Sequence, residues 1–210
     1  MKDEFNIQLL GIKEALEIFD PQKVIAASRK SLERVSSSAI THASREIRTE
    51  YNIKAKDLRK FLRMSTRPKG YSIEAVITGT GLGLALAGFD AKQTGVKTAK
   101  GGFQYTKRAT RSGWQRYGGD VTVRVKASSG RKVVSGKYGN KPFIARMKSG
   151  HLGVWVRQSE ERLPILQLFG PGVGGLFGSK RIMESTEKHI NEIFPKEFHH
   201  NLDYYLGRKS

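Results

Sequence analysis

Two stretches of the sequence have glycine spacings close to those of nucleotide-binding loops. The stretch "GTGLGL" at residues 79–84 nearly fits the dinucleotide pattern, in which glycines let the backbone approach a pyrophosphate, but Leu84 stands in place of the third glycine. The stretch "GRKVVSGKYG" at 130–139 nearly fits a P-loop, but it has one residue too many before its Gly-Lys pair, and Tyr138 replaces the Ser or Thr that would hold magnesium. We therefore expect a hairpin turn at 79–84 and no nucleotide or other cofactor.

Histidine and carboxylate side chains, the usual acid-base and metal-binding groups, show no catalytic spacing. His151 stands beside glycines, where a hydrogen-bonding role in a turn is expected. His199 and His200 are adjacent, so they would project in different directions on a helix, and no third ligand stands at a suitable spacing. Glu160 and Glu161 are flanked by arginines, a pattern typical of a solvated charge cluster. Because the chain also has no cysteine, we predict neither a metal site nor an enzyme.

Cationic side chains are concentrated in the middle third of the chain. The formal net charge is +19, and residues 71–150 hold 15 Lys and Arg against 3 Asp and Glu. Such an excess attracts polyanions. Within 91–119 the cations alternate with Phe103, Tyr105 and Trp114, a spacing that can place cations on phosphates and rings on bases. The sequence has no recognised nucleic-acid-binding fold, which favours the other explanation, a solvated or subunit-facing arm. The residues that we predict to face DNA or a neighbouring protein are Lys97, Lys100, Lys107, Arg108, Arg111, Arg116, Arg131, Lys132 and Lys137.

The N-terminal part of the sequence predicts one strand and three helices. Residues 5–9 alternate as a strand does, 12–19 form a short amphipathic helix, and a helix of about thirty residues starts at Pro21, a residue favoured at the first helical position. Asn52 is expected to stop that helix in a left-handed conformation, and 54–64 to form the third helix. The predicted buried stripe of the long helix is Val24, Ala27, Ser31, Val35, Ala39, Ala43, Ile47 and Tyr51.

From residue 71 onward the pattern changes to the period of two that is typical of strands. Strands are predicted at 71–79, with a hairpin partner at 82–89, and at 121–127, 142–147, 153–157 and 163–169. Pro164 indicates that the last of these is an edge strand, or else that the proline stands among the first residues of the strand. The residues expected to hold this sheet together are Phe143, Val154, Trp155, Ile165, Leu168 and Phe169, and the C-terminal helix should bury Ile182, Ile190, Ile193 and Phe194, with a break or kink at Pro195.

These elements predict an α+β fold, in which a mostly antiparallel sheet or partial barrel is packed by a long N-terminal helix and a C-terminal helix. We expect a single domain spanning residues 1–210, with a strand and helices in 1–66, sheet in 71–90 and 121–169, basic glycine-rich arms or loops in 91–119 and 128–141, and the C-terminal helix in 179–206. No uncharged run is long enough for a membrane-spanning helix, and no signal peptide is expected.

The most specific pattern begins at a Phe-containing strand and ends at a Phe-Gly-Pro turn. Between them stand Gly-His-x-Gly-Val-aromatic-x-Arg, a charged loop and Leu-Pro-Ile. Together with "LRKFL" after a long Ala- and Ser-rich helix, this order resembles the minor tail protein Z, or tail-completion, family of long-tailed phages and prophages. The resemblance is looser over 20–65 and absent from 91–140. The residues that carry it are Phe143, Gly150, His151, Gly153, Val154, Trp155, Arg157, Leu163, Pro164, Ile165, Phe169, Gly170 and Pro171.

The resemblance implies a structural virion protein at the head-proximal end of the tail, assembled in the host cytoplasm and needed for the tail to join the head. Related proteins form rings, usually sixfold, around the DNA channel. The implied partners are further copies of the chain in a hexamer, the tail terminator, the neck or connector proteins, and genomic DNA contacted without sequence specificity; no membrane is implied. The quoted motif would then belong to the folding core. The alternative is a freestanding prophage protein that binds nucleic acid through its basic middle region.

Overall fold

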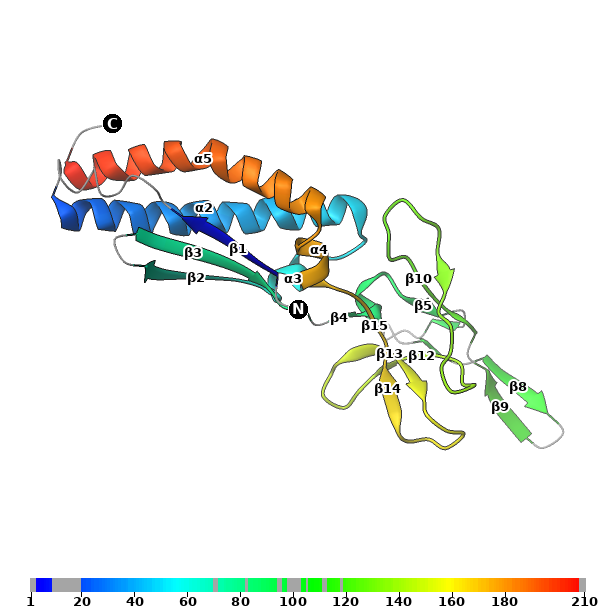
Figure 1. Ribbon diagram of the computed structural model, residues 1–210. Helices are drawn as coiled ribbons and strands as arrows, with labels where there is room; N and C mark the ends of the chain where they lie inside the picture. The colour runs from blue at the N-terminus through cyan, green and yellow to red at the C-terminus, as the bar shows by residue number, and fades with distance from the viewer. Residues whose placement is uncertain are drawn as a thin grey trace. The chain divides into compact units, whose positions relative to one another are not determined.

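The computed structural model describes residues 3–8, 20–69, 72–81, 83–93, 96–97, 103–104, 106–110, 113–117 and 119–207 (Figure 1). The chain divides into two compact units. Unit 1 comprises Met1–Ile47, Ala55–Leu82 and Gly172–Ser210, and unit 2 comprises Arg48–Lys54 and Gly83–Pro171. Both long helices and several small antiparallel sheets are present, so the predicted α+β class is confirmed, and no sheet among the described strands closes into a barrel.

The sheet of unit 1 has three antiparallel strands in the order β1-β3-β2. These are β1 (Asp3–Gln8), β2 (Leu62–Lys69) and β3 (Ser72–Gly79), and Ile77 of the central strand lies opposite both Phe5 and Met64. Five consecutive residues of β3, from 73 to 77, are buried, as expected for a strand that is covered on both faces. Glu74 is among them, and its carboxylate lies 3.4 Å from the Arg67 guanidinium.

Helix α2 (Pro21–Glu50) forms as its sequence predicts. The carboxylate of Asp20 accepts a hydrogen bond from the backbone N–H of Gln22 (3.0 Å), which caps the first turn, and Pro21 needs no such partner. The predicted stripe is buried from Val24 to Ile47, and Tyr51 at its end is half-buried. Unit 1 is completed by α3 (Ala55–Arg59), α4 (Val173–Phe177) and α5 (Lys180–Leu206), which continues through Pro195.

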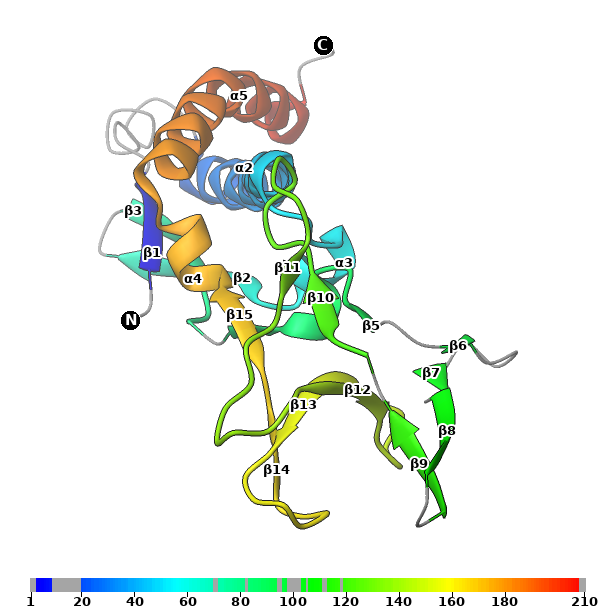
Figure 2. The ribbon, with the colours of Figure 1, turned by 90° about the vertical axis from the view of Figure 1, so that its right-hand side faces the viewer.

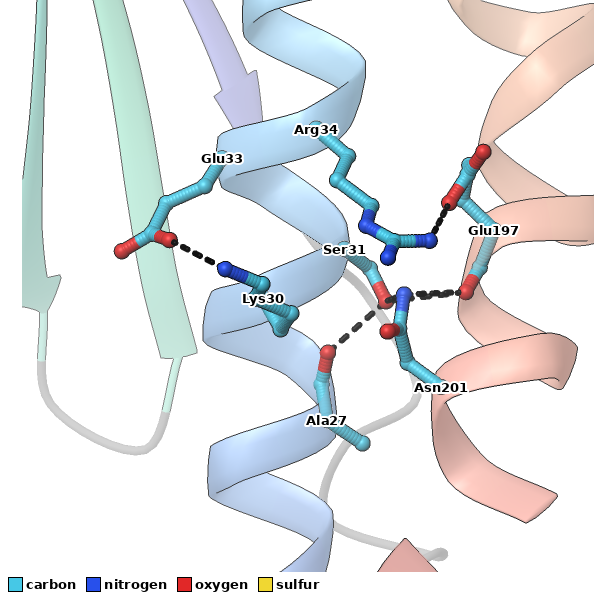
Figure 3. Close-up of polar contacts among 7 residues, drawn as sticks. All are labelled: Ala27, Lys30, Ser31, Glu33, Arg34, Glu197 and Asn201. Atoms are coloured by element: carbon cyan, nitrogen blue, oxygen red, sulfur yellow. Dashed lines mark hydrogen bonds and ion pairs between the residues drawn. The ribbon is translucent and has the colours of Figure 1, made fainter. Parts of the chain in front are cut away.

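Helices α2 and α5 run antiparallel and make a regular series of polar contacts along their seam. The contacts pair Glu46 with Arg181, His42 with Ser185, Ser38 with His189, Arg34 with Glu197, and Ser31 with Asn201. Figure 3 shows one end of the seam, where Asn201 donates to the Ser31 hydroxyl (3.0 Å) and Arg34 lies 3.2 Å from the Glu197 carboxylate. Neighbouring contacts are mostly four residues apart on each helix, the spacing that returns side chains to the same face. The register of the two helices is thus specified by polar pairs.

The rings of His42 and His189 stack in this seam, with centroids 4.2 Å apart. Burial lowers the pKa of His189, His42 and Arg45 lower it further, and Glu192 acts in the opposite direction. Because the folded pKa lies below the unfolded value, the unfolded chain binds more protons as the pH falls through about 6.5. Stability is therefore expected to decrease from neutral pH down to the folded pKa and then to level off.

A His189→Gln variant should lose this part of the pH dependence. The measurement is the melting temperature followed by far-ultraviolet circular dichroism between pH 7.5 and 5. His200→Gln, at an exposed position of the same helix, removes one histidine outside the stacked pair and should keep the wild-type profile. Identical profiles for wild type and His189→Gln would contradict the assignment.

Three local predictions for this part of the chain are wrong. The third helix ends at Arg59 rather than continuing to residue 64, because the chain from Leu62 pairs with β3 instead. Residues 83–85 form β4 (Gly83–Ala85), which pairs with β15 and not with β3. Asn52 is not left-handed; its backbone N–H donates to the carbonyl of Val125 (2.8 Å). The helix predicted at 12–19 lies outside the described residues.

Unit 2 consists of short strands and turns (Figure 2). Its sheets have the orders β11-β10-β5, β12-β13-β14, β15-β4, β6-β7 and β8-β9. The remaining elements are η1 (Leu86–Gly88), β5 (Lys92–Gln93), β6 (Val96–Lys97), β7 (Phe103–Gln104), β8 (Thr106–Thr110), β9 (Gly113–Tyr117), β10 (Val121–Val123), β11 (Lys132–Val133), β12 (Phe143–Arg146), β13 (Leu152–Arg157), β14 (Ile165–Gln167) and β15 (Phe169–Gly172). The strands predicted at 142–147 and 153–157 are confirmed. The strand predicted at 163–169 is divided: β14 lies at the edge of the β12-β13-β14 sheet, as Pro164 indicates, whereas Phe169 begins β15, which pairs with β4.

The core of unit 2 joins several of its small sheets. Its buried cluster is Val121, Ile144, Val154, Val156 and Leu168. The buried side chain of Gln93 connects three segments, because its Oε1 accepts from the backbone N–H of Ile144 (3.0 Å) and its Nε2 donates to the carbonyl of Gly119 (3.1 Å). Among the described residues, no helix is long and apolar enough to cross a membrane.

Candidate functional site

The aromatic part of the sequence motif lies on β12 and β13. Trp155 is paired with Phe143, and its indole N–H donates to the carbonyl of Ala145 (3.1 Å). A Cβ atom at Gly153 would lie 2.8 Å from the Trp155 ring, so only glycine leaves room for this orientation of the indole. The guanidinium of Arg157 lies 5.3 Å from the centre of the Phe143 ring, within the range of a cation–π interaction. These motif residues therefore order the sheet.

The charged loop that follows β13 is held by backbone contacts. Arg157 donates to the carbonyls of Arg162 (2.6 Å) and Glu161 (3.3 Å). Asn140 donates to the carbonyls of Arg157 (3.3 Å) and Ser159 (3.1 Å). Residues 158–162 are exposed, which confirms the solvated charge cluster predicted for Glu160 and Glu161.

His151 has the turn role expected from its neighbours. Gly150 adopts a φ of +82°, a left-handed conformation that favours glycine, and the carbonyl of His151 accepts from the backbone N–H of Met147 (2.8 Å). The His151 ring is exposed and lies 2.8 Å from the side-chain nitrogen of Gln167. It also meets the Trp155 ring edge-on, with centroids 6.1 Å apart. The imidazole thus links the turn to strand β14.

The Phe-Gly-Pro end of the motif packs differently from the prediction. Phe169 is 57% exposed, so its assignment to the sheet core is wrong, whereas the burial predicted for Leu168 is confirmed. A Cβ atom at Gly170 would lie 2.6 Å from the ring of Phe89, which is fully buried. The glycine therefore permits close approach of β15 to an aromatic side chain from outside the motif. Leu163 and Pro164 are exposed, and Ile165 is half-buried.

The basic residues predicted to face DNA or a neighbour have different environments. Arg131 forms an ion pair with Asp90 and also donates to the backbone carbonyl of Asp90 (2.8 Å), so it connects two segments of unit 2. Lys132 and Lys137 are exposed, and neither side chain has an ion-pair or hydrogen-bond partner within the described part of the chain. Of the predicted cations whose side chains the structure describes, Lys132 and Lys137 are therefore available to a partner, whereas Arg131 is not.

The remaining predicted cations belong to 91–119, the segment expected to form arms or loops. The structure places the backbone of Lys97 in β6, of Lys107 and Arg108 in β8, and of Arg116 in β9. In the β8-β9 hairpin, Lys107 and Arg116 occupy directly opposed register positions. The periodicity analysis did not predict this hairpin. Lys100 and Arg111 lie outside the described residues.

Unit 2 also contains a hollow that the sequence analysis missed. It has a volume of about 510 Å³, and its lining includes Arg48, Asn52, Lys54 and Arg124, from segments far apart in the sequence. These positions follow no sequence periodicity. They are neighbours only because tertiary contacts bring their segments together. Among the described side chains, no group of three His, Cys, Asp or Glu residues is placed to hold a metal ion.

The comparison with known families identifies the chain. The family model described as prophage minor tail protein Z (GPZ) matches residues 10–209. The chain belongs to this family. The resemblance inferred from the motif is thereby confirmed, and the chain is a bacteriophage minor tail protein, a structural component of the virion. The same comparisons found no match among curated proteins or solved structures.

Family membership extends over more of the chain than the motif does. The match includes 91–140, where the motif analysis found no resemblance. Within the motif of this minor tail protein, Trp155, Gly153 and Gly170 are packing residues. Each of the three makes a close contact or hydrogen bond inside unit 2 that explains its residue type.

Proposed function

We propose that the chain completes the head-proximal end of a phage tail as a hexameric ring, which connects the tail to the neck and surrounds the DNA channel. The observation that carries this proposal is the match of the minor tail protein Z family to nearly the whole chain. The chain would act as an assembly component without catalysing a reaction, and its partners would be further copies of itself, the tail terminator and the neck proteins.

Exposed apolar side chains in unit 2 support a role in assembly. Large apolar side chains that face solvent often mark interaction sites when they gather on one part of a protein. Strand β14 carries one of them, Leu166, and two more, Leu163 and Phe169, lie two residues outside its ends. β14 is also the edge of its sheet, and an edge strand can be completed by a neighbouring subunit. The exposed apolar residues of unit 2 are Val133, Tyr138, Leu152, Leu163, Leu166 and Phe169.

The cationic character of unit 2 supports a position next to DNA. Residues 71–150 hold 15 Lys and Arg but only 3 Asp and Glu. Of these acids, Asp90 is paired with Arg131 and Asp120 lies 3.3 Å from Lys141. Most of the cations therefore have no acidic partner in their own segment, and closed cyclic symmetry would present them repeatedly around a channel.

The proposal can be tested by adding purified protein to phage tails assembled without it. We expect the added chain to appear at the head-proximal end of the tail and to restore joining of heads, both counted by electron microscopy. Mass photometry of the protein, alone and with these tails, should detect a discrete ring. Binding along the shaft or at the distal end would contradict the proposed position. A monomer or dimer that binds DNA but never associates with tails would support the freestanding nucleic-acid-binding alternative.

A further inference from the structure

The hollow in unit 2 lies where three segments of the chain are held together by backbone hydrogen bonds. The N–H of Asn52 donates to the carbonyl of Val125 (2.8 Å), and the N–H of Ala127 donates to the carbonyl of Glu50 (2.8 Å). The N–H of Arg124 donates to the carbonyl of Phe89 (3.0 Å). These hydrogen bonds fix the positions of the three segments that line the hollow: the residues after α2, those around η1 and those after β10.

Three cations around this hollow have no partner among the residues that the structure describes. The side chains of Arg48, Lys54 and Arg124 are exposed, and no hydrogen bond or ion pair joins them to any residue that the structure describes. The only acid in the lining is Asp90, whose carboxylate is paired with Arg131. The C-terminal end of α2 contributes about half of one negative charge nearby. Three full positive charges outweigh it, so the hollow is electropositive.

One polar group in the hollow is buried and unsatisfied. The side-chain nitrogen of Asn52 is inaccessible to solvent and has no hydrogen-bond acceptor. A buried donor without a partner is unfavourable and uncommon in native proteins. Asn52 lines the hollow, so a rotation of its side chain would let an anionic oxygen bound there accept this hydrogen bond while the three cations neutralise its charge.

We propose that this hollow binds a phosphate group of the DNA backbone. Arginine matches phosphate oxygens through two parallel N–H donors, and two of the three cations are arginines. The surplus of positive charge extends through residues 71–150, well beyond the hollow, so an extended polyanion neutralises more of it than a single acidic side chain does. The inference rests on the proposed function in one respect: the polyanion that a channel-lining subunit meets is genomic DNA.

The test compares two triple variants of the full chain that lose the same charge. Arg48→Gln, Lys54→Gln and Arg124→Gln remove the cations of the hollow. Arg59→Gln, Arg162→Gln and Lys188→Gln remove two arginines and one lysine elsewhere, all exposed and without a described side-chain partner. Because the net charges of the two variants are equal, long-range attraction to DNA falls equally in both.

Binding of a fluorescein-labelled DNA duplex is measured by anisotropy over a range of salt concentrations. Each phosphate contact that is lost lowers the slope of log K against log salt by about 0.9. Because the three cations are proposed to hold one phosphate group, we expect the hollow variant to lower the slope by about 0.9 and the control variant to lower it by clearly less. Equal slopes for the two variants would overturn the proposal.

Asn52→Leu provides a second test without a change of charge. Since the Asn52 amide has no partner in the free protein, its replacement by leucine should leave the melting temperature unchanged or raise it. DNA affinity should fall about tenfold, because a hydrogen bond to a charged group is lost. Unchanged DNA affinity would overturn the role of Asn52.

A final comparison separates DNA from an acidic protein partner. Poly-glutamate is titrated against the same variants; if it binds as tightly as DNA and depends on the hollow to the same extent, an acidic protein surface is the ligand and the proposal fails. These measurements use the isolated protein, whereas the proposed function is tested by its position in the particle. A protein that completes tails but shows no effect of the hollow would disprove only this inference.

Discussion

Replacing Phe89 with alanine is expected to lower the free energy of unfolding of unit 2 by about 3–5 kcal/mol. The Phe89 ring is fully buried, and the backbone of Gly170 lies against it so closely that no Cβ atom would fit between them. The backbone of β15 cannot move into the vacated space without breaking its pairing with β4. The alanine variant should therefore retain a cavity, which adds to the loss of buried apolar surface.

The loss is measured by urea denaturation, with tryptophan fluorescence as the signal. This signal reports on unit 2 alone, because Trp114 and Trp155 are the only tryptophans of the chain and both lie between residues 83 and 171. The matched control is Phe169→Ala, which removes the same side chain from an exposed position and should change the stability by less than about 0.5 kcal/mol. A similar loss in both variants would show that Phe169 is part of the core after all.

The second large effect is expected in unit 1, where Gly174→Leu should cost about 1–3 kcal/mol. A Cβ atom at Gly174 would lie 3.2 Å from the carbonyl oxygen of Gly79 and 3.2 Å from the backbone of Gly81. Backbone atoms cannot rotate aside as a side chain can, and the Gly174 N–H also donates to the carbonyl of Thr80 (3.0 Å). The larger residue would force α4 away from the end of β3.

The adjacent residue provides the control. A Cβ atom at Gly175 would have no atom within 4 Å, and leucine favours a helix over glycine by somewhat less than about 1 kcal/mol. Gly175→Leu should therefore be neutral or slightly stabilising. Far-ultraviolet circular dichroism follows unit 1, which contains α5 and most of α2. If both variants lost equal stability, helix propensity or solubility rather than the close contact with β3 would explain the result.

The two destabilising variants also test the division of the chain into two units. Damage at Phe89 should lower the fluorescence transition with little change in the dichroism transition, and damage at Gly174 should do the reverse. If the units unfold as one cooperative body, each variant would shift both transitions together.

Much of the secondary structure could be predicted from sequence, because it depends on local patterns. The cap at Asp20, Pro21 and a stripe of small and apolar residues specify α2, and the alternation from residue 72 specifies β3. The glycines at 150 and 153 are likewise explained by local geometry, a left-handed turn and the neighbouring Trp155 ring. The motif was also sufficient to indicate the family.

Other features depend on contacts between distant residues, which periodicity does not record. Residues 62–64 read as the end of a helix but form a strand, because pairing with β3 satisfies their backbone groups. Leu168 and Phe169 were both predicted to be buried, and only the tertiary structure shows that Phe169 faces solvent. Arg48, Lys54 and Arg124 have no common pattern, yet tertiary folding places them around one hollow. The sequence by itself determined the two long helices, several strands and the family. Only the tertiary structure decided the strand partners and the position of the unpaired cations, since both arise from long-range packing.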